Sequence, residues 1–153
     1  MTKNAINSNN APQAIGPYSP AVKLGDFLFF SGQIAIDPSS GEMIEGDVGQ
    51  QTSQVMKNII GLLSELYLET RHIVKTTVFL SDMKDFNEFN EEYAKYFDEP
   101  YPARSTVQVA ALPKNAKVEI ECLVIDTLAY EMAECGGCNQ QDCPSDCGGC
   151  SNE

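Results

Sequence analysis

The clearest apolar pattern in the chain covers residues 48 to 66, where apolar side chains recur every three or four positions and polar ones fill the opposite side. This period predicts an α-helix with one buried stripe, and its length corresponds to about five turns. A stripe of aromatic residues from 86 to 97 predicts a second helix. Asp82 or Asp85 can cap its start, and it should end before Pro100.

Five segments have the patterns of β-strands. Residues 22–24 and 27–36 flank a Gly-Asp turn and predict a hairpin. Residues 73–80 are dense in β-branched and aromatic side chains, while residues 105–109 and 118–122 alternate between apolar and polar. We expect these last two strands to be neighbours, because a short loop joins them.

Several positions fall outside these regular patterns. Gly32 interrupts the second hairpin strand, which indicates either a β-bulge or a close approach of the backbone to a ligand. Residues 1–10 are polar and without periodicity, which indicates a loose arm. Residues 11–20 contain three prolines, which indicates a stiff extended segment. Tyr18 can pack in the core or line a site, and composition favours packing. His72, the single histidine, is interpreted as a solvated turn residue.

The order of the elements is hairpin, helix, strand, helix and two further strands. It predicts an α+β fold in which one mostly antiparallel sheet is covered by two helices. Such an arrangement leaves the second face of the sheet bare, and association with another copy is the simplest way to bury that face. We therefore expect an oligomer.

Composition and charge exclude several classes of function. The 153 residues suit one domain with a core of its own, and a net charge of −12 without a basic stripe disfavours nucleic acid as a partner. No apolar run is long enough to span a membrane, and the N-terminus has no signal-peptide pattern, so we expect a cytoplasmic protein.

Arg104 and Glu119 are the candidate reactive side chains. Arg104 begins one predicted strand, and its planar guanidinium is suited to clamp a small carboxylate. Glu119 lies within the next predicted strand, where a shielded carboxyl group can carry protons. An ordinary surface arginine and an outward-facing glutamate fit the same pattern.

The end of the chain differs in composition, so we divide the chain into a domain of residues 1–130 and an acidic tail of residues 131–153. The tail holds five acidic and no basic residues. Its two Cys-Gly-Gly-Cys pairs flank a fifth cysteine, a pattern that favours bound zinc or an iron–sulfur cluster, with redox pairs and plain disorder as alternatives. The candidate ligands are Cys135, Cys138, Cys143, Cys147 and Cys150. Cys122, alone in a strand, is interpreted as a small buried hydrophobe.

Six short motifs occur in the order and spacing of one known family. They are AIGPYS (14–19), FSGQ (30–33), IVKTTVF (73–79), YPARS (101–105), ALPK (111–114) and KVEIE (117–121). Over about residues 11 to 127 the chain resembles the RidA/YjgF family of enamine/imine deaminases. The resemblance implies a chorismate-mutase-like homotrimer with a central barrel and active sites in the clefts between subunits. It also implies hydrolysis of 2-aminoacrylate, 2-iminopropanoate and similar imines to 2-keto acids and ammonia, without a cofactor.

The resemblance implies roles for individual positions. Arg104 matches the family's carboxylate clamp, and Glu119 matches the residue that orients or activates the attacking water. The other matches are positions that line the family's substrate pocket: Tyr18, Ser31, Gly32, Asn90 and Thr106. Thr106 stands where many members have a cysteine, so the pocket has no thiol chemistry at this position.

Two other functions are compatible with these residues. A trimer without catalytic activity could bind small carboxylates through Arg104 and regulate a partner, with the tail as a metal or redox module. A ribonuclease role, sometimes attached to the family, fits poorly with the net charge of −12 and a single histidine.

Overall fold

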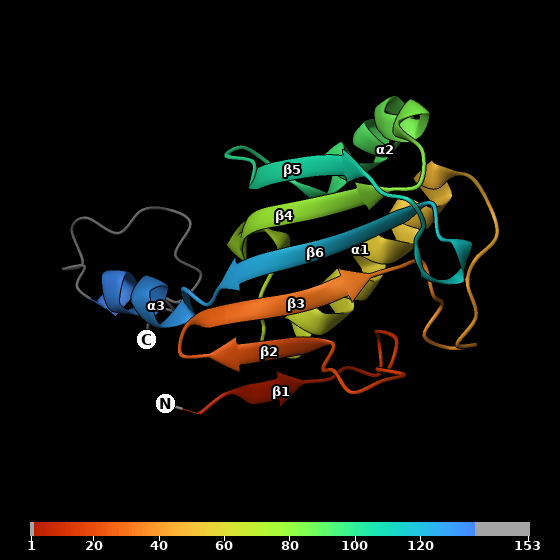
Figure 1. The fold of residues 1–153 in the computed structure, drawn as a ribbon. Coiled ribbons are helices and arrows are strands. Elements are labelled where there is room, and N and C mark those ends of the chain that lie inside the picture. The colour runs from red at the N-terminus through yellow and green to blue at the C-terminus, as the bar shows by residue number, and fades with distance from the viewer. Residues whose placement is uncertain (1, 137–153) are drawn as a thin grey trace.

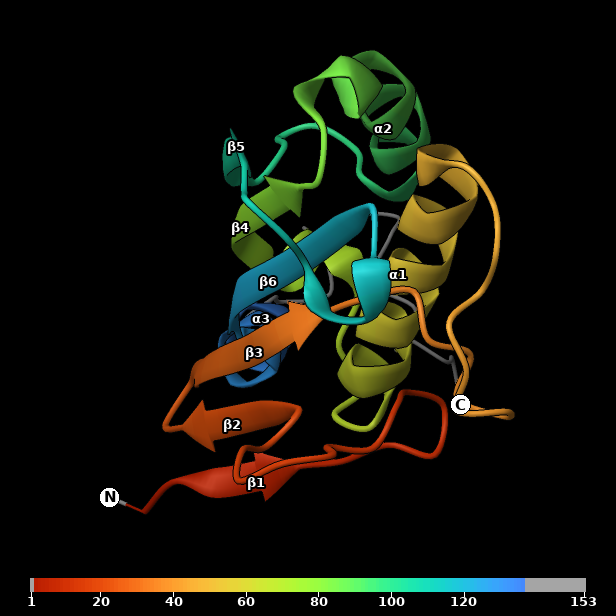
Figure 2. The same cartoon turned by 45° about the vertical axis from the view of Figure 1, so that its right-hand side comes forward.

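A computed structural model describes residues 2–136 of the chain. Over this range it shows one six-stranded sheet with the order β1-β2-β3-β6-β4-β5 and two helices on one face (Figures 1 and 2). The strands are β1 (Asn4–Ile6), β2 (Ala21–Leu24), β3 (Phe27–Gln33), β4 (Ile73–Leu80), β5 (Ala103–Gln108) and β6 (Val118–Ile125). The helices are α1 (Val48–Ser64), α2 (Phe86–Tyr93) and α3 (Leu128–Gly136). The α+β class and the two covering helices, α1 and α2, are confirmed.

Strand pairing is antiparallel throughout this sheet except between β4 and β5, which are parallel. The expectation that the last two predicted strands are neighbours is wrong, because β4 lies between β5 and β6. The helix α2 connects β4 to β5, and a strand–helix–strand connection returns the chain in the same direction, which makes the pair parallel. β6 then lies between β3 and β4, antiparallel to both.

The N-terminal residues are not a loose arm. β1 forms the edge of the sheet and pairs with β2, with Ala5 opposite Val22. Asn4 and Ala5 are exposed and Ile6 is only half-buried, so the strand is held chiefly by backbone hydrogen bonds, which leave no apolar period in the sequence. An edge strand of this kind cannot be predicted from side-chain pattern alone.

Both predicted helix starts carry an aspartate cap. The Asp47 carboxylate accepts the backbone N–H of Gln50 at 2.8 Å, and the Gln50 side chain accepts the N–H of Asp47 at 3.0 Å, which closes a capping box at α1. Asp82 accepts the N–H of Lys84 and caps a short 3-10 turn (Met83–Asp85) that leads into α2. Asp85, the N-cap residue of α2 itself, makes no side-chain capping bond, so of the two candidate caps only Asp82 is used, for the turn before the helix.

The core lies between the sheet and the two covering helices. One stripe of α1 is fully buried, as its apolar period predicts, and α2 contributes Phe89 and Tyr93. Cys122 faces the same core, and burial raises the pKa of its thiol, so the prediction of a small buried hydrophobe is confirmed. The opposite face of the sheet has no covering layer within the described residues. There Phe27, Phe29 and Val107 remain 49%, 52% and 44% exposed.

His72 is buried, with 3% of its surface exposed, so its interpretation as a solvated turn residue is wrong. Its Nδ1 accepts the backbone N–H of Glu69 at 3.0 Å within a short 3-10 turn (Thr70–His72). The imidazole therefore closes the turn that leads into β4, and its Nε2 lies 3.5 Å from the Glu131 Oε1 of α3.

Helix α3 is attached to this turn by an ion pair. Arg71 donates from both terminal nitrogens to the two Glu131 oxygens, at 2.9 and 3.0 Å, and Thr127 donates its hydroxyl to the same carboxylate. These bonds, first that of Arg71, lower the pKa of Glu131 to about 2. Tyr130 adds a bond from its hydroxyl to Asp26 in the β2–β3 turn at 2.6 Å.

Most of the predicted tail lies outside the described residues. Cys135 falls in α3, and Cys138, Cys143, Cys147 and Cys150 lie beyond residue 136. The zinc or iron–sulfur site therefore stays a prediction, as does the boundary after residue 130. Among residues 2–136, no helix is both long and apolar enough to cross a membrane.

Replacing Glu131 by glutamine should loosen α3, because a neutral amide cannot form the charge-assisted pair with Arg71. Since the pair is exposed, we expect a change of local order rather than a large loss of global stability. Amide hydrogen exchange over residues 128–136 at pH 7 should become several-fold faster. Glu91→Gln, on the exposed side of α2, is the matched control and should leave this exchange unchanged. Equal protection in both variants would mean that other contacts hold α3.

Candidate active site

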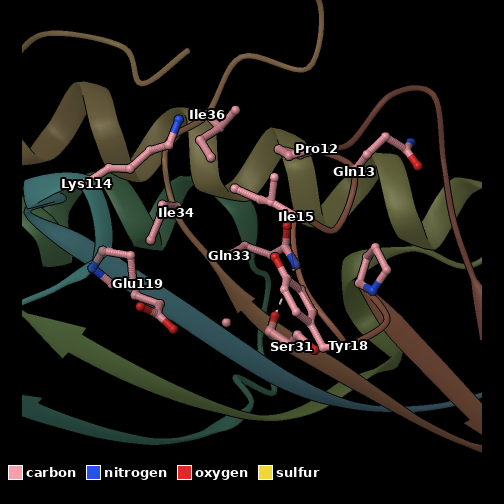
Figure 3. A pocket seen from close by; sticks show the side chains of 13 residues that line it. Pro12, Gln13, Ile15, Tyr18, Ser31, Gln33, Ile34, Ile36, Lys114 and Glu119 are labelled. Carbon is pink, nitrogen blue, oxygen red and sulfur yellow. Dashed lines mark hydrogen bonds between the residues drawn. The ribbon is translucent and has the colours of Figure 1, made fainter. Parts of the chain in front are cut away.

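The first cavity lies beside the bulge of β3 and has a volume of about 350 Å³. Figure 3 shows Tyr18 and Ser31 at one side of it, and Glu119 and Lys114 at the other. Apolar walls come from the N-terminal segment and from the chain after β3, with Ile15 and Ile36 among them. A cavity with apolar walls and a few polar groups is the usual form of a small-molecule site.

Gly32 allows Glu119 to lie against the backbone of the bulge. A Cβ atom at this position would be 1.9 Å from the Glu119 Oε1, closer than two such atoms can approach. The sheet register shifts between Phe30 and Gln33, so the predicted bulge is confirmed. The close approach is also present, and it involves the carboxyl group of Glu119.

The proline-rich segment is fastened to the same bulge. Ser31 donates its hydroxyl to the Ser19 carbonyl at 2.7 Å and its N–H to the Pro20 carbonyl at 3.0 Å. Tyr18, whose N–H donates to the Gly16 carbonyl at 2.8 Å, remains 53% exposed and lines the cavity. Composition favoured core packing for Tyr18, whereas the structure makes it a wall of the cavity.

Glu119 is half-buried and lines this cavity. Burial, and next the nearby charge of Glu121, raise the pKa of the Glu119 carboxyl above its ordinary value. A carboxyl group with a raised pKa exchanges protons more readily near neutral pH than an ordinary glutamate. Lys114, at the rim, brings a positive charge to the same cavity and has a backbone φ of 54°, which a lysine rarely adopts.

The second cavity, of about 400 Å³, lies at the Arg104 side chain on β5. The Arg104 Nη2 donates to the Asn90 Oδ1 at 2.7 Å, so Asn90 holds one end of the guanidinium. Three aromatic rings of α2 lie near the guanidinium carbon, with centroids at 5.8 Å (Phe86), 5.5 Å (Phe89) and 4.9 Å (Tyr93). Arg104 is therefore a fixed cation beside a cavity, and not an ordinary surface arginine.

Thr106 lies two residues beyond Arg104 on β5. Its Oγ1 is buried and has no hydrogen-bond partner within the described residues. A buried hydroxyl without a partner is costly. Thr106 lines neither of the two cavities, so its contact with a ligand stays a prediction.

Arg104 and Glu119 lie on opposite faces of the sheet. Arg104 is opposite Thr76 of β4, and Glu119 is opposite Phe79 of the same strand. These two β4 residues are an odd number of positions apart, and successive side chains of a strand point to opposite faces. The two cavities also share no lining residue. One chain alone therefore does not bring its two candidate reactive groups together.

The sequence matches a family model described as Endoribonuclease L-PSP over residues 8–126. The chain belongs to this family. It is the RidA/YjgF family, so the resemblance of the six motifs is confirmed. The match ends just before α3, which begins at Leu128.

Named members of the RidA/YjgF family are close to this chain in sequence and structure. The chain is 44% identical to human 2-iminobutanoate/2-iminopropanoate deaminase over 125 residues, which are 82% of this chain and 91% of that protein. It is 47% identical to Arabidopsis thaliana Reactive Intermediate Deaminase A, chloroplastic, over 80% of this chain and 66% of that one. A crystal structure of E. coli TdcF with bound serine has a TM-score of 0.76 and 42% identity, covering 80% of this chain and 98% of that one.

Sequence reasoning missed some residues of this RidA-family site. Lys114 stands in one of the six motifs, but its strained backbone and its place at the rim leave no sign in the sequence. Tyr93 was read only as part of an apolar helix stripe, although its ring also contacts Arg104. Its hydroxyl group, unusual in a buried stripe, was the available signal.

Replacing Gly32 by alanine should push the Glu119 carboxyl out toward solvent, because the new Cβ would occupy its place. The moved atoms are the end of a flexible side chain, so the fold should persist. Since burial is the main cause of the raised pKa, the pKa of Glu119 should fall toward its ordinary value of 4.5. A carbon-13 NMR titration of the carboxyl group measures this shift.

Gly49→Ala is the matched control, because its added Cβ would approach no atom of another residue closer than 3.3 Å. It should leave the Glu119 titration unchanged. An unchanged pKa in Gly32→Ala would mean that Glu119 does not depend on the bulge for its burial.

Proposed function

We propose that this chain hydrolyses small enamine and imine acids, such as 2-aminoacrylate and 2-iminopropanoate, to 2-keto acids and ammonia. The geometry that carries this proposal is the guanidinium of Arg104, which Asn90 and three aromatic rings hold beside a cavity large enough for a small acid. The names of relatives at 44–47% identity support the same reaction.

The chemistry uses only groups that the chain supplies. An imine carbon is electrophilic, and more so when its nitrogen is protonated. Arg104 binds the substrate carboxylate through N–H groups not used by Asn90, which fixes the imine carbon in place. Water adds to that carbon while Glu119 takes one of its protons and passes it to the nitrogen, which gives the carbinolamine R–C(OH)(NH₂)–COO⁻. Glu119 then takes the hydroxyl proton and passes it to the NH₂ group as the C–N bond breaks and the C=O bond forms. In total R–C(=NH)–COO⁻ and H₂O give R–C(=O)–COO⁻ and NH₃.

We further propose that each active site forms between two copies in a homotrimer. Arg104 and Glu119 lie on opposite faces of one sheet, so Arg104 of one subunit meets the Glu119 cavity of a neighbour. The exposed apolar side chains Phe27, Phe29 and Val107 on the uncovered face supply the surface for association.

The nuclease activity in the family description is not favoured by this site. The single histidine, His72, is buried beside Glu69 and Glu131, and neither cavity includes it. A net charge of −12 also repels a phosphate backbone.

Arg104 and Glu119 should affect different kinetic parameters. Arg104→Ala removes the carboxylate clamp and should raise KM about 100-fold, which corresponds to loss of one or two charge-assisted hydrogen bonds. Glu119→Gln should lower kcat at least about 100-fold, as expected for a general acid–base, while binding of 2-ketobutyrate persists. Release of 2-keto acid from freshly generated 2-iminopropanoate, corrected for the spontaneous rate, measures both.

Glu42→Gln is the control and should leave both parameters unchanged, because Glu42 is exposed and lines neither of these two cavities. If the unmodified chain binds 2-ketobutyrate but does not accelerate hydrolysis, the chain is a binding module and not an enzyme.

Mixing the two inactive chains tests the shared site. If Arg104→Ala and Glu119→Gln subunits exchange at random in a 1:1 mixture, about one site in four receives an intact Arg104 and an intact Glu119. Activity should therefore return to about a quarter of the original value, as measured after mixing under exchange conditions. No recovery, with exchange verified by mass spectrometry of the intact assembly, would place both residues of a site in one chain.

A further inference from the structure

Behind Arg104 lies a pair of buried hydroxyl groups, Thr76 on β4 and Tyr93 on α2. The Thr76 Oγ1 and the Tyr93 Oη are 2.8 Å apart. Thr76 is fully buried and Tyr93 is 5% exposed. A pair of hydroxyl groups in an apolar core contributes less to the free energy of folding than well-packed apolar side chains of the same shape. Stability alone therefore does not explain why the pair is present.

Both residues of the hydroxyl pair, Thr76 and Tyr93, are also neighbours of Arg104. Thr76 is the register partner of Arg104 in the parallel β4–β5 pair. The Tyr93 ring lies 4.9 Å from the guanidinium carbon, closer than the rings of Phe86 and Phe89. Tyr93 therefore touches the guanidinium with its ring, while its hydroxyl is tied to the strand beside Arg104.

We propose that Tyr93 and Thr76 are positioning residues, which fix the plane of the Arg104 guanidinium for the substrate carboxylate. The inference rests on the proposed function, since it assigns to Arg104 the role of carboxylate clamp. Asn90, three residues before Tyr93 on α2, holds the Nη2 group at 2.7 Å. The Tyr93 ring lies 4.9 Å from the guanidinium carbon, so a hydrogen bond and a ring contact together restrict rotation of the guanidinium plane.

The charge states are compatible with this role. Burial is the first cause of a raised pKa at Tyr93, so the hydroxyl stays neutral and does not form a competing ion pair with Arg104. Thr76 is neutral at every pH. The full positive charge of Arg104 thus remains available for an anion.

A bidentate arginine–carboxylate pair depends on orientation, so a freely rotating guanidinium binds the acid less well. The clamp holds substrate and transition state alike, because the carboxylate does not react. Loss of positioning should therefore raise KM and leave kcat nearly unchanged.

Two single substitutions test this role. Tyr93→Phe and Thr76→Val each remove one hydroxyl and should each raise KM about three- to tenfold, the range expected for one hydrogen bond and the orphaned partner. Thr76→Ser keeps a hydroxyl group and should restore most of the affinity. The double variant should be no worse than either single variant, because it leaves no buried hydroxyl without a partner.

Tyr96→Phe is the matched control. The Tyr96 hydroxyl also makes hydrogen bonds, with the Ser53 Oγ at 2.9 Å and to the Glu92 Oε1 at 3.2 Å, but Tyr96 is not one of the three rings near Arg104. Its loss should lower the melting temperature by a similar amount and leave KM unchanged. The Nε–Hε NMR signal of Arg104 should shift and broaden in Tyr93→Phe and stay sharp in Tyr96→Phe.

A double-variant cycle shows whether Tyr93 acts through Arg104. In an Arg104→Ala background, Tyr93→Phe should have no further effect on KM. A further rise of KM in that background would mean that Tyr93 contacts the substrate directly. An unchanged KM and an unchanged Arg104 NMR signal in Tyr93→Phe alone would mean that Tyr93 is only a core aromatic residue. Either result overturns the inference.

Affinity for 2-ketobutyrate, measured by calorimetry, separates this inference from the proposed function. It should weaken in Tyr93→Phe by the same three- to tenfold factor, about that of one hydrogen bond, even if the chain hydrolyses no imine. Weakened binding without hydrolysis in any variant would refute the deaminase and keep the positioning role.

Discussion

A β-strand points successive side chains to opposite faces of its sheet, and this alternation governs where the reactive groups of the chain can meet. Arg104 faces the layer of α2, while Glu119 faces the bulge on the uncovered side, with β4 between their strands. Small shifts in one chain cannot join groups separated in this way. The site that we propose therefore requires a second copy, and the exposed apolar face gives that copy a reason to bind.

Different interactions prepare Glu119 and Arg104 for their proposed roles. Because Gly32 has no Cβ atom, the Glu119 carboxyl group can lie against the backbone of the bulge, where partial burial raises its pKa. At Arg104, an amide oxygen and aromatic rings fix a cation whose charge attracts anions in a chain of net charge −12. A local fixed charge at short range can outweigh distant repulsion that salt screens.

Much of the fold could be predicted from the sequence, because most of its elements carry a periodic pattern. The stripe of α1, the hairpin of β2 and β3, and the bulge at Gly32 all follow from neighbouring residues. The edge strand β1 could not be predicted, since backbone hydrogen bonds hold it. The burial of His72 could not be predicted either, since the local sequence does not show that Glu131, far away in the chain, lies 3.5 Å from its Nε2.

The sequence by itself determined the helices α1 and α2, the central strands, the membership of the RidA/YjgF family and the identity of the two candidate reactive side chains; it gave no sign of α3. Only the tertiary structure decided that β4 separates β5 from β6, that Arg104 and Glu119 occupy opposite faces, and that Tyr93 supports Arg104. The physical reason is the range of the interactions. Periodicity and turn preferences act between residues a few positions apart, whereas strand order and side-chain cages arise from contacts between distant segments.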